Sequence, residues 1–453
     1  MRKQPLLTWL SLVVLLGTVY MPTSAAAEEF RPSPALHASW YFAEGSTQSP
    51  FDTWFLVQNP TDKPAKVRFT FQLQPSGTVT REVTVAPTSR YSLFANEALP
   101  AAAFSTRIDA DQAVLAERAV YVGYDGTIVT GIRSPSRTWL FAEGSTQSPF
   151  HTWLLLQNPG DAQAMANVTY LLDHGNTIAQ SVSLTPNSRT SILVNSVVPN
   201  AAFSTRVDSD QPIVAERAMY RFPGNAAAAV SGVNAPSRTW YFADGNTTQS
   251  PIPFDTWLLL QNPNPAPVPV NIALLDSNGA KTTLSLTLPP TSRQSVFLNQ
   301  IMPDASFGIV VTTDRDPIVV EKALYFGIEP RGAAATQGAT EPSTTWYLAE
   351  GSTASPFTEY ISILNPNAEP ISVHLDFDLP NGQVVGRELS VEKERKLTVN
   401  VNDILPNTAV SARITTSLPT VVERTMLFGK PGSLGGHNTI GIQLPKLVIH
   451  PTE

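Results

Sequence analysis

The chain contains no cysteine among its 453 residues. The protein therefore has no disulfide, no thiolate metal ligand, no cysteine nucleophile and no cysteine to carry the lipid of a lipoprotein. Its stability has to come from hydrophobic cores, which domains of about 100 residues supply at roughly 5–15 kcal/mol each. A chain of this length without cysteine, if exported, is more typical of bacteria than of eukaryotes.

Long runs of like charge are also missing, and the net charge of −7 is spread along the sequence. A nucleic-acid-binding surface is therefore not expected. The six histidines do not recur at matching positions, which excludes a repeated transition-metal site. Calcium is the one metal with plausible oxygen ligands, in the pairs Glu44 with Asp52 and Asp109 with Asp111. Because the position of Asp52 is taken by a histidine and a threonine in later copies, we expect no cofactor.

The only long apolar run lies at the N-terminus, from Leu6 to Tyr20. A basic pair precedes this run, and Ser24-Ala25-Ala26-Ala27 follows it, which is the pattern of a secretory signal peptide at residues 1–27. The run is shorter than the roughly 20 residues that span a bilayer, although an uncleaved anchor stays an alternative. We predict a secreted or cell-surface protein with no membrane span after cleavage.

The sequence contains four copies of one repeat. Trp-Tyr-Phe-Ala-Glu-Gly at residues 40–45 returns in variant form at 139–144, 240–245 and 346–351. The interval of about 100 residues is the size of a small domain and is too long for a solenoid repeat. The predicted division is an N-terminal lead at 28–37 and repeats at 38–134, 135–235, 236–341 and 342–453, the last with a C-terminal closing strand.

The pattern within each repeat predicts an all-β domain. Proline is abundant, with 39 residues, and short apolar or alternating runs are separated by Pro, Gly, Asn and Asp. In the second repeat these runs predict seven strands: 138–141, 152–157, 166–172, 178–184, 190–194, 203–207 and 213–220. Seven strands favour four tandem immunoglobulin-like β-sandwiches over the alternative, a four-bladed propeller. The Ala- and Gly-rich stretches at 224–230 and 332–340 are predicted to be loops or linkers.

Aromatic residues recur in two strands of each repeat. The first set opens the repeated motif: Trp40, Trp139, Trp240 and Trp346. The second set lies in a strand that ends in Asn-Pro: Trp54 with Asn59, Trp153 with Asn158, Trp257 with Asn262, and Tyr360 with Asn365. We interpret the aromatic residues as core anchors and the Asn-Pro pairs as strand ends.

An acidic and a basic residue stand side by side in a late apolar strand of each repeat: Glu117-Arg118, Glu216-Arg217, Glu321-Lys322 and Glu423-Arg424. Alternation puts the two charges on opposite faces, and neither face is polar, so each charge needs a partner. Candidate partners also recur: Arg90, Arg189, Arg293 and Arg395, and the acids Glu44, Glu143, Asp244 and Glu350. We predict a buried brace between sheets or between adjacent domains.

A catalytic interpretation of these acids is weaker. A pair of carboxylates such as Glu44 and Glu117 could serve as the two catalytic acids of a glycosidase. However, four complete sites in one chain are unusual, and no insertion long enough to build a cleft is present. We therefore predict that the protein is not an enzyme and retain a secreted hydrolase only as a remote alternative.

The combination of the Trp-Tyr-Phe-Ala-Glu-Gly turn, the Asn-Pro strand end and the Ala-Glu-Arg strand resembles a family of uncharacterised repeat domains in exported and cell-surface bacterial proteins. The resemblance implies a β-rich surface protein and brings no activity with it. We predict a non-catalytic structural stalk or interaction and adhesion module. The alternative is multivalent binding of carbohydrate or cell wall through the Gly-Ser-Thr-Gln-Ser-Pro-Phe loops, which requires exposed Phe51, Phe150, Phe254 and Phe357.

Overall fold

The computed structural model describes residues 39–172, 175–221, 226–328, 331–430 and 433–444. The predicted signal peptide (1–27) and lead (28–37) lie outside these residues. The described residues lie in one compact unit, and almost all of its regular structure is β-strand, as the sequence predicts.

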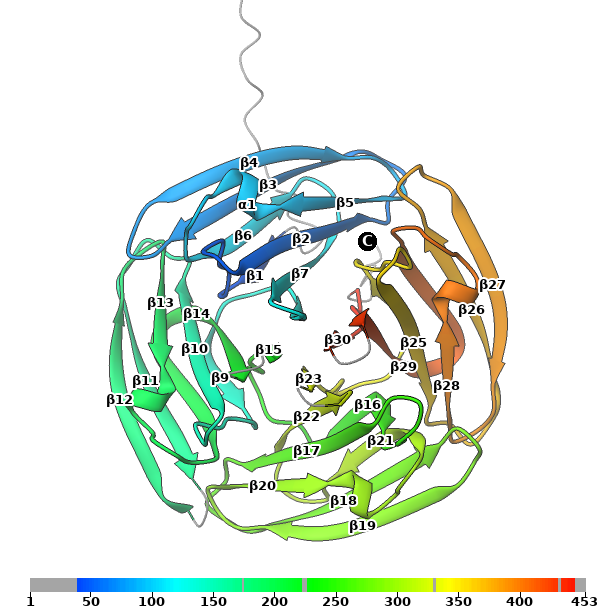
Figure 1. Cartoon of the computed structure of the whole chain (residues 1–453). Coiled ribbons are helices and arrows are strands. Elements are labelled where there is room, and N and C mark those ends of the chain that lie inside the picture. The colour runs from blue at the N-terminus through cyan, green and yellow to red at the C-terminus, as the bar shows by residue number, and fades with distance from the viewer. Residues whose placement is uncertain (1–38, 173–174, 222–225, 329–330, 431–432, 445–453) are drawn as a thin grey trace, which may run out of the picture. The chain divides into compact units, whose positions relative to one another are not determined.

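The strands recur in four comparable sets, which we call repeats 1 to 4 (Figure 1). Repeat 1 contains β1 (Ser39–Phe42), β2 (Phe51–Asn59), β3 (Ala65–Leu73), β4 (Thr78–Val85), β5 (Ser89–Phe94), β6 (Phe104–Ala110), β7 (Leu115–Val122) and β8 (Asp125–Thr130). Repeat 2 contains β9 (Ser136–Phe141), β10 (Phe150–Asn158), β11 (Ala164–Leu172), β12 (Thr177–Leu184), β13 (Ser188–Leu193), β14 (Phe203–Arg221) and β15 (Ala226–Ser231).

Repeat 3 contains β16 (Thr239–Asn246), β17 (Phe254–Asn262), β18 (Val268–Asp276), β19 (Lys281–Leu288), β20 (Ser292–Phe297), β21 (Ser306–Thr312), β22 (Val319–Phe326) and β23 (Gly332–Gln337). Repeat 4 contains β24 (Ser343–Leu348), β25 (Phe357–Asn365), β26 (Ile371–Asp378), β27 (Val384–Val391), β28 (Arg395–Asn400), β29 (Ser411–Lys430) and β30 (Ser433–Ile440). One helical turn follows the fifth strand of each repeat: α1 (Ala95–Ala98), η2 (Val194–Ser196), η3 (Leu298–Gln300) and η4 (Val401–Asp403).

Each repeat is a sandwich of two antiparallel sheets. In repeat 1 the sheet orders are β1-β6-β3-β4 and β5-β2-β7-β8. In repeats 2 and 4 the long strands β14 and β29 run through both sheets. Each of them makes the pairings that two separate strands, β6 and β7, make in repeat 1. The first sheet lies on the outside in Figure 1, with β4, β12, β19 and β27 at the periphery. In β12 alternate residues are exposed, as expected for a strand with one face toward water.

The last strand of repeats 2 and 3 was not predicted. The Ala- and Gly-rich stretches expected to be loops form β15 and β23, which pair with β14 and β22. Together with β8 and β30 they pack against one another around the middle of the four repeats. Small side chains suit these strands because β8, β15, β23 and β30 converge at the middle of the ring and leave little room. The Ala- and Gly-rich strands therefore lack the β-branched residues that mark an ordinary strand.

The four repeats form a closed cycle. Each of the pairs β8 and β15, β15 and β23, β23 and β30, and β30 and β8 is in contact, so repeat 4 meets repeat 1. Cores also extend across neighbouring repeats: Tyr347 and Ala349 of repeat 4 pack in the core of repeat 1. An extended stalk is therefore not the arrangement of residues 39–444. The sandwiches close into a ring.

The four Trp-Tyr-Phe strands belong to the repeats that they begin. β1 pairs with β6, and β24 pairs with β29. The chain after the central strand makes one further bridge to this strand, as between Tyr41 and Ile132 and between Tyr347 and Ile442. Ile442 therefore takes the place of Ile132, whereas residues 445–450 of the predicted closing strand (442–450) lie outside the described residues.

Candidate functional site

The recurring charges meet where two repeats touch, at faces that we call seams. At seam 1–2 the guanidinium of Arg118 binds two carboxylates, at 2.8 Å from Glu44 of its own repeat and 2.6 Å from Glu216 of repeat 2. The other oxygen of Glu216 accepts a hydrogen bond from the backbone N–H of Ala43 at 2.9 Å. Tyr220 donates to the remaining oxygen of Glu44 at 2.7 Å. Every side chain of this cluster is buried.

A corresponding ion pair joins the two repeats at each of the other seams. Arg217 binds Glu143 and Glu321 at seam 2–3, Lys322 binds Glu423 at seam 3–4, and Arg424 binds Glu350 and Glu117 at seam 4–1. The last ion pair joins residues that are 307 positions apart and closes the cycle. The predicted brace thus lies between adjacent repeats. Strand alternation places each acid toward the preceding repeat, as Val214, Ala218 and Tyr220 on the face of Glu216 pack against Tyr41 and Ala43.

Burial sets the electrostatics of the seams. It raises the pKa of Glu216, although the adjacent Arg118 guanidinium opposes this. Burial alone would lower the pKa of Arg118, but Glu216 and Glu44 together raise it above the ordinary value. Arg118 thus stays charged between the two carboxylates. A buried pair of this kind is costly to break, because loss of one partner leaves an uncompensated charge.

A second cation reaches across seams 1–2 and 4–1. Arg189 donates to the carbonyl oxygens of Gly45 and Phe104 in repeat 1, and Arg90 donates to those of Gly351 and Val410 in repeat 4. Arg293 occupies the matching position of repeat 3, paired with Gln261.

In repeat 4 the prediction of Arg395 for this role was wrong. Strand pairing places Lys396 opposite Leu364, as Arg189 lies opposite Gln157, and the ammonium of Lys396 binds Asp244 at 2.5 Å. Arg395 is one register position away and pairs with Asn365, and a one-residue offset reverses the face of a strand. The ammonium groups of Lys396 and Lys322 hold the pKa of Asp244 below its usual range despite its burial.

The motif tryptophans Trp40, Trp139, Trp240 and Trp346 are at most 3% exposed and lie in the sandwich cores. Each indole N–H donates to a backbone carbonyl, as Trp40 does to Val114 at 2.9 Å. The second set, Trp54, Trp153, Trp257 and Tyr360, is only half-buried. Trp54 stacks on Phe94, with ring centroids 4.5 Å apart, on the face of β2 opposite to the core residue Phe55.

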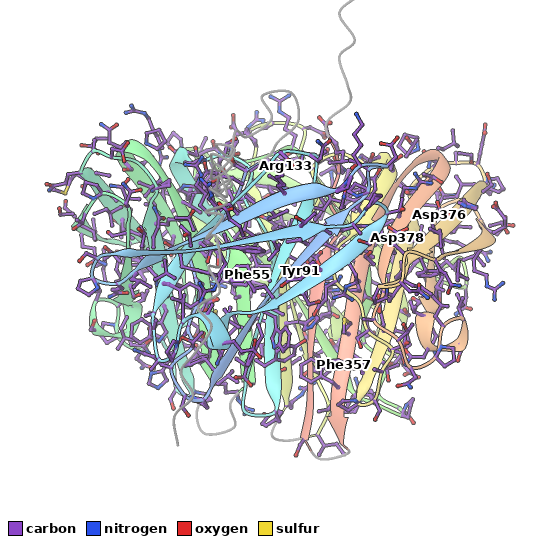
Figure 2. All side chains as sticks on the ribbon, turned by 90° about the horizontal axis from the view of Figure 1, so that it is seen from above. Phe55, Tyr91, Arg133, Phe357, Asp376 and Asp378 are labelled. Atoms are coloured by element: carbon purple, nitrogen blue, oxygen red, sulfur yellow. The ribbon has the colours of Figure 1, made fainter. Side chains whose placement is uncertain are left out.

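The asparagines Asn59, Asn158, Asn262 and Asn365 end their strands and are buried. The side-chain amide of Asn59 donates to the carbonyls of Lys63, Val85 and Ala86 and thereby ties two loops together. The phenylalanines of the Ser-Pro loops are not exposed platforms. Phe51 packs on Tyr220 of repeat 2, and Phe357 packs on Tyr121 of repeat 1. Figure 2 shows Phe357 and Arg133 toward opposite ends of the ring.

One acid lies where the four central strands begin. Asp125, on β8, accepts hydrogen bonds from the backbone N–H groups of Ala227 at 3.0 Å, Ala333 at 3.1 Å and Gly436 at 2.8 Å. These donors come from repeats 2, 3 and 4. Burial raises the pKa of Asp125 to about 7, although the N–H groups favour the ionised form. The sequence analysis missed this residue. Its counterparts in the other central strands are Ala226, Gly332 and Gly435, and this single acid among small residues was the available signal.

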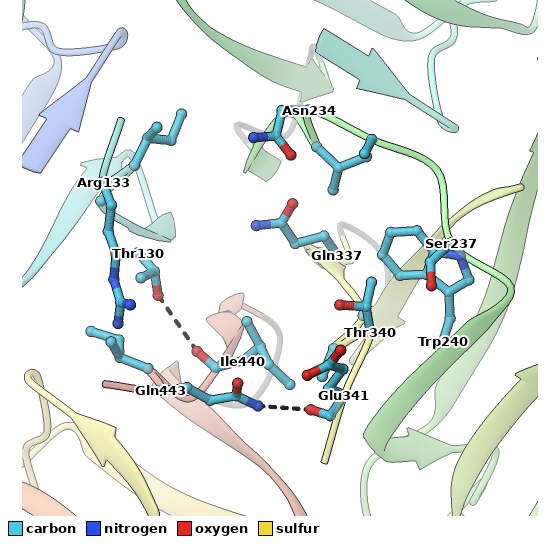
Figure 3. A pocket seen from close by; sticks show the side chains of 18 of the residues that line it. Thr130, Arg133, Asn234, Ser237, Trp240, Gln337, Thr340, Glu341, Ile440 and Gln443 are labelled. Atoms are coloured by element: carbon cyan, nitrogen blue, oxygen red, sulfur yellow. Dashed lines mark hydrogen bonds between the residues drawn. The ribbon is translucent and has the colours of Figure 1, made fainter. Parts of the chain in front are cut away.

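A pocket of about 660 Å³ opens where the central strands end (Figure 3). All four repeats line it, and equivalent glycines form its frame: Gly131, Gly232, Gly338 and Gly441. A Cβ at Gly131 would lie 2.7 Å from Phe42 and 3.0 Å from Trp40, so only glycine lets this segment cross the core aromatics. Between the pocket and Asp125 the strands are packed, with a cavity of about 20 Å³ among Ile128, Val230 and Ala335.

The rim of the pocket breaks the symmetry. The residue two positions after each frame glycine is Arg133, Asn234, Thr340 or Gln443. Figure 3 shows these four side chains around the opening, together with Gln337 and Glu341. Arg133 lies with its guanidinium carbon 5.3 Å from the ring centre of Trp40. The signal in the sequence was a glycine four residues before each of Pro135, Pro236, Pro342 and Pro445, with a divergent residue between them.

The described residues contain no cluster of three His, Cys, Asp or Glu side chains suited to a metal ion. Of the oxygens proposed for calcium, those of Glu44 bind Arg118 and Tyr220, whereas Asp52 accepts from Asn96. Among the helices in this part of the chain, none is long and apolar enough to cross a membrane. The arrangement therefore offers an axial pocket with mixed polar groups and, at the seams, buried ion pairs that a ligand would not reach.

No protein-family model and no curated protein matches this chain. The resemblance to exported repeat domains stays a prediction. Solved structures that match include Thermotoga maritima 1070, which is 17% identical with a TM-score of 0.21, over 22% of this chain and 96% of that one. The Anabaena sensory rhodopsin transducer is 28% identical with a TM-score of 0.17, over 18% of this chain and 95% of that one.

A tetra-tandem repeat from the extending region of a large adhesion protein is 11% identical with a TM-score of 0.11, over 84% of this chain and 92% of that one. These TM-scores are low, and no inference about function rests on them.

Proposed function

We propose that this protein is an exported, non-catalytic interaction module that binds one ligand per chain in the axial pocket. The observation that carries the proposal is the contrast between the frame and the rim. The frame glycines recur in all four repeats, whereas the rim presents Arg133, Asn234, Thr340 and Gln443. A rim whose only task was to close the ring would not need four different polar side chains.

Several features support a binding role without catalysis. The recurring acids are buried in ion pairs with Arg118 and its counterparts, so they lack the open site that general acid-base chemistry requires. The pocket instead carries amide, hydroxyl and guanidinium groups and the exposed carboxylate of Glu341, which bind and orient a ligand. Its volume of about 660 Å³ lies within the range of small-molecule sites.

Export is part of the proposal. It is supported by the basic residues, the apolar run and the small-residue motif at 1–27, and by a chain without cysteine. The ring is suited to such a location, because each repeat is held by its own core and by two seams. The multivalent carbohydrate-binding alternative is less well supported, since Phe51 and Phe357 pack at seams and do not form exposed platforms.

Native mass spectrometry with the chain from Glu28 to Glu453 tests the proposal directly. The panel consists of amino acids, short peptides, sugars and peptidoglycan fragments. We expect saturation at one molecule per chain. The double variant Asn234→Trp/Thr340→Trp places two large side chains at exposed rim positions and should abolish binding.

The matched control is Thr80→Trp, at an exposed position on β4, far from the pocket in the sheet order. It should bind as the unaltered chain does. Four bound molecules per chain, or binding that the rim variant leaves unchanged, would contradict the axial site.

A further inference from the structure

The rim contains one cation, Arg133, that forms no ion pair within the described residues. Within the described residues Arg133 makes no ion pair or hydrogen bond, and its one polar contact is the cation–π contact with Trp40. The side chain is half-buried, and burial lowers its pKa. A guanidinium held against an indole has lost part of its water but keeps its five N–H donors free in a planar fork.

The fork selects for one class of ligand group. Planar carboxylates bind guanidinium groups through two parallel hydrogen bonds, and such charge-assisted pairs are roughly twice as strong as neutral ones. The stacked indole limits the rotation of Arg133 and so orders the fork before a ligand arrives. Figure 3 shows Arg133 among the side chains that line the pocket.

A second unpartnered group adds a requirement. The side-chain oxygen of Gln337 is buried and accepts no hydrogen bond within the described residues. Gln337 is the last residue of β23 and also lines the pocket. Because this oxygen has almost no exposed surface, the Gln337 amide has to turn toward the pocket before a ligand O–H or N–H group can donate to it. A buried acceptor without a donor costs free energy, and this cost favours the turn.

The third group limits ligand charge. Glu341 lines the pocket, is exposed, and forms no ion pair within the described residues. Its carboxylate repels a second negative charge on a ligand, and the net charge of −7 acts in the same direction. A ligand with one carboxylate fits this balance better than a polyanion.

We infer that the axial pocket binds a small monocarboxylate, with the carboxylate on Arg133 and an O–H or N–H donor directed to the side-chain oxygen of Gln337. This inference rests on the proposed function and specifies its ligand class. The chemistry is shared by two sources, a sugar acid and an N-acylated amino acid. Each carries one carboxylate together with hydroxyl or amide donors.

Isothermal titration calorimetry separates the two sources and tests the inference. The probes are glucuronate and N-acetylalanine, with glucose and N-acetylalanine amide as their uncharged partners. We expect at least one of the two acids to bind about tenfold or more tightly than its uncharged partner, because the pair with Arg133 is charge-assisted. Binding of glucuronate alone identifies a sugar acid, and binding of N-acetylalanine alone identifies an acyl amino acid.

Variants assign the effect to the residue. Arg133→Gln should remove the preference for the acid while it leaves the weak binding of the uncharged partner. Arg133→Lys keeps the charge but loses the fork, and should retain only part of the preference. Arg137→Gln, at an exposed position outside the pocket lining, is the control and should bind normally. Unfolding temperatures close to that of the unaltered chain verify that the variants are folded.

Equal affinity for acid and uncharged partner would overturn the inference but leave the proposed function standing, provided that Asn234→Trp/Thr340→Trp abolishes both. An unchanged acid preference in Arg133→Gln would also overturn it. The inference would also be overturned if neither glucuronate nor N-acetylalanine showed saturable binding. In that case the broader mass-spectrometry panel tests the proposed function separately.

Discussion

The carboxylate of Asp125 accepts a hydrogen bond from the backbone N–H of Gly436, 311 residues later in the chain. Its second oxygen accepts from Ala227 and Ala333. One side chain of repeat 1 thus binds the central strand of every other repeat. Asp125 connects all four repeats at one point, whereas each seam connects only two.

We expect Asp125→Ala to lower the free energy of unfolding by at least about 3 kcal/mol. The substitution leaves three buried N–H groups without an acceptor, and each such group costs roughly 1–3 kcal/mol. Urea denaturation followed by circular dichroism measures the loss. Asp62→Ala, in an exposed loop of the same repeat, is the control and should change stability by less than about 0.5 kcal/mol. Equal stability of the two variants would show that the axial hydrogen bonds contribute little.

Stability should fall as the pH rises from 6.5 to 8, in part because of Glu359. Burial at seam 4–1 raises the pKa of Glu359 to about 8, opposed by Arg424 and Arg90 and reinforced by Glu350. The folded state therefore holds a proton that the unfolded state, with an ordinary value of 4.5, has released. Stability is fully present below the unfolded pKa and is lost as the pH rises through the folded pKa, by about 1.4 kcal/mol for each pH unit.

The chosen window separates Glu359 from His437, a second buried group of the same seam. Burial lowers the pKa of His437 below its ordinary value of 6.5, so most of the change in its contribution falls below that pH. Asp125, with a pKa of about 7, adds the same fall in all three proteins. Urea titrations across the window should show a smaller slope for Glu359→Gln than for the unaltered chain. Glu97→Gln, exposed on α1, should keep the full slope. Identical slopes in all three proteins would mean that Glu359 is ionised in the folded state.

Loss of Arg424 should open the ring. Seam 4–1 is the one joint that no chain connection bridges directly, and Arg424→Met leaves Glu117 and Glu350 buried without their partner. Breaking such a pair costs roughly 3–5 kcal/mol. Small-angle X-ray scattering should show a larger radius of gyration for Arg424→Met than for Arg118→Met. In the latter, the chain that joins β8 to β9 still holds the two repeats together. Unchanged scattering from Arg424→Met would show that the central strands alone keep the ring closed.

Glycine at position 435 is required by the crowding of the central strands. A Cβ there would lie 2.0 Å from the carbonyl oxygen of Tyr124 and 2.8 Å from the Cα of Asp125. Both are backbone atoms that cannot move alone. Gly435→Ala should therefore destabilise the protein by roughly 1–3 kcal/mol or more. A Cβ at Gly386 would lie no closer than 3.5 Å to any neighbour, the nearest being His374, so Gly386→Ala is the control for thermal denaturation. Equal unfolding temperatures would contradict the crowding.

The fold class and the charged brace were predictable because both depend on local pattern. Alternation along one strand is sufficient to place Glu216 and Arg217 on opposite faces. Because both faces are apolar, each of the two charges needs a partner. The closure of the ring was not predictable. It depends on contacts such as that of Arg424 with Glu117, for which no local pattern exists.

The central strands and the pocket were missed for a related reason. Strands of Ala and Gly have the composition of a linker, and only their convergence explains their small side chains. Lys396 was missed because Arg395 fits the sequence pattern and the register is known only from pairing with Asn365. Asp125 and the rim residues differ between repeats, so a search for recurrence passes over them.

The single axial acid has a consequence for how such a ring can be encoded. Four identical subunits around the same axis would each present an aspartate at position 125, and four carboxylates would crowd together and repel one another. One gene with four unequal copies can specify an acid in one copy and Ala226, Gly332 and Gly435 in the others. Tandem duplication thus makes available a structure that self-assembly of a single domain would forbid, and the same freedom allows each position of the rim to evolve separately.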